Sequence, residues 1–179
     1  MPPRNIFSNI EFLNKKHIIS YKTNMNTPWK TVDEFKYDSV SDCINDLEQK
    51  NYKVSEWIKD IGTRLKVEPR DYPVNLFRVK VSDFGFTEAC KLEDIYEAFS
   101  SQGYKTVPPD IAILTRLLYD EQPNTEWLRI ATPFDSMLDA DNIPHLPKLG
   151  RGLGMYFIET YWSYRHAIFH PHNEFLVSS

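Results

Sequence analysis

The chain has 179 residues, of which 41% are hydrophobic, 26% charged and 14% aromatic, and its formal net charge is −4. This length and composition suit one globular domain with an appendage, and they exclude a disordered or low-complexity chain. The acidic balance argues against nonspecific nucleic-acid binding by the whole chain, because phosphate neutralisation requires a positive surface. The sequence has no apolar run long enough to span a membrane and no signal-peptide pattern at its start. We therefore expect a cytoplasmic protein with no membrane partner.

The N-terminal part differs from the rest in charge. Residues 1–32 carry five basic residues against one acidic residue, whereas the remainder is strongly acidic. Because sustained periodicity is missing, residues 1–36 are predicted to be an irregular basic N-terminal extension, with Ile18, Ile19 and Tyr21 as a candidate edge strand. Such an extension is either a loosely ordered terminus or the one part expected to contact nucleic acid or an acidic partner.

The next segment shows helical periodicity twice. Apolar residues recur at i, i+3, i+4 and i+7 over 40–47 and again over 54–61, which predicts a helical hairpin spanning 39–62. Serines that can supply the N-cap oxygen precede both helices: Ser39 or Ser41, and Ser55. The Pro-rich segment 68–73 then breaks the pattern and is the best internal boundary.

After this boundary the pattern alternates between strand and helix before it becomes β-rich. Residues 74–82 alternate as a half-buried strand, residues 92–99 repeat the helical spacing, and Pro108 and Pro109 open a further helix. Four later segments are predicted strands: Trp127–Thr132, Leu146–Leu149, Leu153–Trp162 and Glu174–Ser178.

This order of elements predicts the fold class. We expect a single α+β domain over residues 37–179, with an antiparallel sheet of about five strands and about four helices that mostly precede a C-terminal β-meander. Residues 153–162 are apolar on both faces and are predicted to form a central strand.

Two stretches, "VKVSDFGFTEACKLEDIYEAFSSQGY" and "VPPDIAILTRLLYDEQPNTEWLRIATPF", carry a family resemblance. They resemble a group of small bacterial hypothetical proteins that share an Arg-Leu-x-Tyr-x-x-Gln-Pro-x-x-Glu-Trp-Leu motif, and the likeness extends loosely from about Tyr37 to the end. The group has no assigned activity, so the resemblance implies a shared domain without a particular chemistry. The motif residues implied to share a structural or binding role are Arg116, Tyr119, Gln122, Glu126 and Trp127. On a buried helix, Arg116 could pair with Glu126.

The densest group of metal-ligand residue types lies near the C-terminus. His166, His170, His172 and Glu174 fall within nine residues, and His145 is the nearest further ligand candidate. Imidazole and carboxylate groups suit a divalent transition metal such as zinc. The alternative is a loop of surface histidines before the last strand.

Three other motifs have structural interpretations. The loop with Asp135, Asp139 and Asp141 lacks the glycine and distal glutamate of a calcium loop and is predicted to be a polar hairpin connection. The run Gly150–Gly154 leads into a strand and is predicted to be a tight turn, because a phosphate-binding loop would open a helix. The aromatic-rich segment 156–169 either packs as a strand or stacks bases, and the acidic balance favours packing.

Catalytic residues cannot be identified from this sequence. Cys43 and Cys90 fit reduced, structural cysteines. The leading hypothesis is a non-enzymatic protein-interaction or accessory domain that exposes an aromatic-rich patch to a protein partner. The alternative is a metal-dependent hydrolase-type enzyme that uses the C-terminal histidines, and a third option is nucleic-acid contact through the basic arm.

Overall fold

The computed structural model describes residues 27–179. Within this range the structure contains four α-helices, which all precede β5 in the chain. The helices are α1 (Val40–Gln49), α2 (Glu56–Gly62), α3 (Leu92–Ser101) and α4 (Pro109–Leu118), with a short 3-10 turn, η1 (Val81–Phe84). The strands are β1 (Lys30–Val32), β2 (Lys53–Val54), β3 (Val74–Lys80), β4 (Cys90–Lys91), β5 (Trp127–Ile130), β6 (His145–Gly152), β7 (Met155–Trp162), β8 (Ile168–Phe169) and β9 (Glu174–Ser178).

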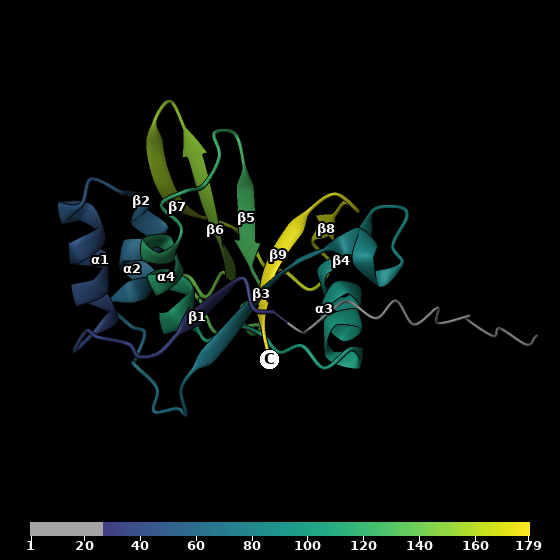
Figure 1. Cartoon of the computed structure of the whole chain (residues 1–179), viewed down its shortest axis with the longest axis horizontal. Helices are drawn as coiled ribbons and strands as arrows, with labels where there is room; N and C mark the ends of the chain where they lie inside the picture. Colours follow the sequence, from purple (N-terminus) through teal and green to yellow (C-terminus); the bar gives the residue numbers. More distant parts are fainter. Residues whose placement is uncertain (1–26) are drawn as a thin grey trace, which may run out of the picture.

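Seven strands form one sheet in the order β1-β3-β9-β5-β6-β7-β2, and β4 and β8 form a separate pair (Figure 1). The α+β class is confirmed, but the sheet is mixed, whereas the sequence predicted an antiparallel one. Strand β9 pairs in parallel with β5, and β2 pairs in parallel with β7. The reason is that β9 does not extend the β5-β6-β7 meander at its edge. It enters between β3 and β5, where it runs antiparallel to β3.

The sheet separates two hydrophobic layers. Alternate strand residues face opposite sides, so one side packs against α1, α2 and α4 and the other against α3, as Figure 1 shows. The predicted helical spacing is confirmed, because the apolar positions of α1 are all buried. Both helices of the predicted hairpin are capped as expected: Ser39 Oγ accepts the Asp42 N–H and Ser55 Oγ accepts the Ile58 N–H.

Strand β7 was predicted to be central, and this is wrong. It lies next to the edge strand β2, which pairs with it at Phe157 and Ile158 alone among the described residues. Three of its hydrophobic side chains, those of Met155, Tyr161 and Trp162, are exposed. The predicted tight turn is confirmed, since β6 and β7 are joined by two residues with positive φ, Leu153 (51°) and Gly154 (75°).

The segment predicted to be an irregular extension contributes one strand. Residues 30–32 form β1, which pairs antiparallel with β3 and buries Val32 in the core. The candidate edge strand at Ile18, Ile19 and Tyr21 lies outside the described residues, as does most of the basic arm. Within residues 27–179, none of the helices has the length and hydrophobicity that crossing a bilayer would require.

Candidate functional site

Arg116 of the sequence motif is a fully buried cation at the end of α4. Its Nη1 donates to Gln122 Oε1 at 2.5 Å, and its Nη2 donates to the carbonyl oxygen of Tyr119. The guanidinium also lies 5.0 Å from the ring of Tyr156 and 5.6 Å from that of Tyr52. Burial lowers the pKa of Arg116 to about 10, so the cation still predominates at neutral pH. The group therefore ties α4 to the following loop and to the β6-β7 hairpin.

Glu126 is not the partner of Arg116 that the sequence suggested. It pairs with Arg78 of β3, which also pairs with Glu174 of β9. Arg78 Nη1 donates to the hydroxyl of Tyr119 at 2.8 Å, and this hydroxyl donates to Glu126 Oε2 at 2.5 Å. Arg116 instead finds acceptors close to it in the chain and in β6-β7. Burial, followed by the bond to Glu126, raises the pKa of Tyr119 to about 12.

Arg78, Glu126 and Glu174 line one side of a cleft that opens where β5 and β9 diverge. The two strands pair at Arg129 and Ile130, and Figure 1 shows them separating toward their N-terminal ends. The cleft has a volume of about 360 Å³. Its lining residues are Arg78, Thr125, Glu126, Trp127, Arg129, His172, Asn173 and Glu174. It therefore brings together members of both groups that the sequence singled out, the motif and the histidine cluster. Sequence reasoning missed Arg78 and Arg129, which occupy alternate strand positions that look solvent-facing.

Of the histidines in the predicted metal site, His172 lines this cleft. His170 and His172 are exposed and their rings stack with centroids 5.6 Å apart, while His166 stacks on Tyr164. Glu174 is engaged by Arg78. Within residues 27–179, no group of three or more His, Cys, Asp or Glu side chains is placed to hold a metal ion. The metal site stays a prediction that stands on the sequence alone.

His145 lies elsewhere, on the far side of β6, with 2% of its surface exposed. Its Nε2 is 3.0 Å from Asp139 Oδ2 and its Nδ1 is 2.9 Å from Thr160 Oγ1. The backbone N–H groups of Asp141 and Ile143 donate to the other carboxylate oxygen of Asp139. The predicted polar connection is thus an aspartate-organised turn that also orients a histidine ring.

The bond to His145, assisted by the two backbone N–H groups, holds the pKa of Asp139 below its usual value. A carboxyl group of this kind stabilises the fold above its unfolded pKa and loses that contribution as the pH falls through its folded pKa. We therefore expect Asp139→Asn to flatten the acid limb of the pH–stability curve. Urea midpoints measured from about pH 6 to about pH 3 should fall less for D139N than for the wild type. D135N, at an exposed loop residue, should follow the wild type, and an unchanged acid limb in D139N contradicts the assignment.

The ring of His145 is the second member of a continuous row of neighbouring rings. Its centroid lies 5.0 Å from that of Trp57 and 5.2 Å from that of Trp162. Trp162 is followed by Tyr164 at 6.4 Å, and Tyr164 by His166 at 5.6 Å. We call these five residues the ring ladder. Trp57, Trp162 and Tyr164 are 46%, 44% and 39% exposed, so the ladder presents aromatic faces to solvent over a buried histidine.

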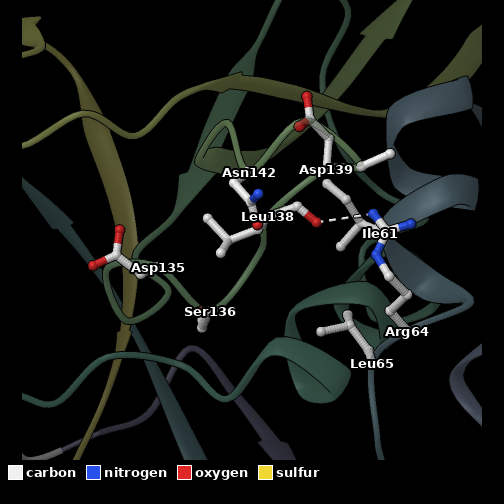
Figure 2. Close-up of a pocket in the computed structure, with 9 residues that line it drawn as sticks. Ile61, Arg64, Leu65, Asp135, Ser136, Leu138, Asp139 and Asn142 are labelled. Atoms are coloured by element: carbon white, nitrogen blue, oxygen red, sulfur yellow. Dashed lines mark hydrogen bonds between the residues drawn. The ribbon is translucent and has the colours of Figure 1, made fainter.

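A shallow pocket of about 330 Å³ lies beside the aspartate turn, between α2 and the loop 135–142 (Figure 2). Arg64 reaches across it and donates to the carbonyl oxygen of Leu138 at 3.0 Å. Asp135 and Asp139 lie on opposite sides of the pocket, so their carboxylates do not converge. This arrangement offers no cluster of oxygen ligands for calcium.

The two cysteines differ in burial. Cys43 is buried in α1, and burial raises the pKa of its thiol to about 12. Burial also raises the pKa of Cys90, which is partly exposed. Because the thiolate is the reactive form, these shifts disfavour nucleophilic chemistry at both thiols.

Comparison of the chain with protein-family models, curated proteins and solved structures gives no match.

Proposed function

We propose that this protein is a non-enzymatic protein-interaction domain whose partner binds the ring ladder. The observation that carries the proposal is the row of five neighbouring rings, of which Trp57, Trp162 and Tyr164 are partly exposed. Tryptophan and tyrosine are the side chains that most often dominate the energy of protein interfaces, since each offers a large rigid area with few torsions to fix. Exposed aromatic groups that lie together are also costly for a monomer unless they serve a contact.

The ladder is held in place before any partner arrives. His145 is fixed through both ring nitrogens by Asp139 and Thr160, and it supports Trp57 on one side and Trp162 on the other. A surface that is already ordered loses little conformational entropy on binding, which favours affinity. This support also explains a buried aspartate–histidine pair without invoking catalysis.

The neighbouring strand edge gives the partner a second means of attachment. Strand β7 carries Trp162, and among the described residues its outer edge is paired through β2 at Phe157 and Ile158 alone. The remaining part of this edge can accept an extended segment by main-chain hydrogen bonding, while the ladder binds its side chains. An extended segment with apolar or aromatic side chains is therefore the partner chemistry that fits this site.

The test is affinity capture from the source cells with matched tryptophan variants. Immobilised wild type should retain a partner that the double variant W57A/W162A binds at least about tenfold more weakly, as expected when two interface tryptophans are removed. W127A is the control, because Trp127 is similarly exposed at 39% but lies outside the ladder.

Equal unfolding midpoints show that the variants remain folded. The proposal is overturned if W57A/W162A retains the same proteins as the wild type, or if W127A loses them equally. A partner retained by the wild type and by W127A is then titrated in calorimetry against each purified variant. It should bind the wild type and W127A with similar affinity and W57A/W162A more weakly.

A further inference from the structure

We infer that the cleft between β5 and β9 is a second, independent site, which binds a small carboxylate with a flat apolar body through Arg129. Arg129 lies on β5 opposite Lys148 of β6 and Phe175 of β9, at the point where the cleft begins. Its guanidinium carbon lies 5.6 Å from the centroid of the Phe169 ring. The position is rigid, since three paired strands hold its backbone.

The guanidinium of Arg129 has no acceptor among residues 27–179. It makes no hydrogen bond or ion pair there, and its Nε is buried without a partner. The other buried or half-buried arginines of the described region each donate to protein oxygens: Arg70 to Asp110, Arg78 to Glu126 and Glu174, Arg116 to Gln122 and backbone carbonyls, and Arg151 to the Gln122 carbonyl. Arg70 Nη1, Arg116 Nε and Arg151 Nε are also buried without a partner, but each of those guanidinium groups donates through another nitrogen. Among these arginines of the described region, Arg129 is the one whose guanidinium has no acceptor at all.

An unpaired cation of this kind is costly to the fold. Burial lowers the pKa of Arg129, because removal of water disfavours the charged form. A buried charged group is normally paired, because its desolvation is otherwise uncompensated. An anionic ligand would supply the missing acceptors.

The surroundings favour a carboxylate over a phosphate. A planar guanidinium fork matches a carboxylate in bidentate geometry, and a single unpaired cation balances a single negative charge. Glu126 and Glu174 line the same cleft, where Arg78 bonds to both. Their remaining negative charge disfavours a dianion such as phosphate. Lys148 does not add a free cation, because it lies 3.4 Å from Glu159 and 4.3 Å above the ring of Trp127.

The apolar part of the ligand is inferred from Trp127, which also lines the cleft. Trp127 lines the cleft with a ring that is 39% exposed and is held over Gly150, where a side chain would collide with it. The volume of about 360 Å³ lies in the range of small-molecule sites. An aromatic carboxylate can thus place its charge on Arg129 and its ring against Trp127.

The test is a titration followed by proton–nitrogen correlation NMR of the full chain, with benzoate, acetate and inorganic phosphate as probes. Benzoate should produce saturable shifts in the Arg129 side-chain Nε–H signal and in the amides of residues 125–130 and 172–175. Acetate should produce the same pattern more weakly, and phosphate should not compete with benzoate.

Three variants decide the result. R129Q should weaken benzoate binding by at least about tenfold, as expected for a lost charge-assisted pair, while R165Q, at an exposed arginine, should bind as the wild type does. W57A/W162A should also bind benzoate normally, which separates this site from the ring ladder. The inference is overturned if benzoate shifts do not saturate, if they persist in R129Q, or if phosphate binds as tightly as benzoate.

Discussion

Arg116→Met is expected to lower the free energy of unfolding by about 3 kcal/mol, because it leaves several buried acceptors without a donor. The wild-type guanidinium serves Gln122 Oε1 and the carbonyl oxygens of Tyr119, Gly150 and Phe157. Methionine fills much of the space but donates to none of them. Removal of the desolvated cation offsets part of this loss, which is why the expected effect is smaller than the sum of the bonds.

The measurement is urea unfolding followed by circular dichroism at neutral pH. Arg165→Met is the matched control, since Arg165 is exposed and its guanidinium lies 4.3 Å from the ring centroid of Phe134, while its side chain makes no hydrogen bond to a described residue. It should change stability by less than about 0.5 kcal/mol. If R116M were as stable as R165M, the buried acceptors would be satisfied in another way, and the structural role of Arg116 in the motif would be refuted.

Arg78→Met is expected to cost about 2–3 kcal/mol at neutral pH. Arg78 stands between Glu126 and Glu174, whose side chains are 20% and 19% exposed. Without the guanidinium, two partly buried carboxylates face each other, with the hydroxyl of Tyr119 on Glu126 and Lys80 at 3.7 Å from Glu174. The repulsion between these carboxylates is the reason for the expected loss.

Urea midpoints of wild type, R78M and the triple variant R78M/E126Q/E174Q at neutral pH test this reason. The triple variant removes the repulsion chemically, and it should recover part of the stability that R78M loses. Equal midpoints of R78M and the triple variant would show that packing, and not charge, sets the role of Arg78.

The local signals in the sequence were sufficient for the helices. Apolar spacing and the serine caps located α1 and α2, and Pro109 at the first turn located α4. Strands β1, β2, β4 and β8 have two or three residues, which is too short for alternation to be recognised. Strand order depends on contacts between distant segments, so the parallel pairing of β9 with β5 has no local signal.

In the candidate sites too, local features could be predicted from the sequence, whereas contacts between distant segments could not. The sequence identified the motif residues, but it assigned Glu126 to Arg116, because both lie in one motif and Arg78 lies far away in the chain. Arg129 looked like a solvent-facing strand residue, since its lack of an acceptor is visible in three dimensions alone. The contribution of Trp57 to the ring ladder was likewise hidden, because the residue belongs to an amphipathic helix remote from the aromatic-rich segment.

The position of β9 has a consequence for how the chain folds. Residues 174–178 join β1-β3 to β5-β6-β7-β2, and their partners in β3 are about a hundred residues earlier, as in the pair Arg78 and Leu176. Such long-range closure is entropically expensive and slows folding. The two parts of the sheet therefore stay unconnected, with β3 and β5 unpaired on the sides that face β9, until this segment has taken its place. Until that moment the unpaired edges of β3 and β5 are the places where the nascent chain is most exposed to association with other chains.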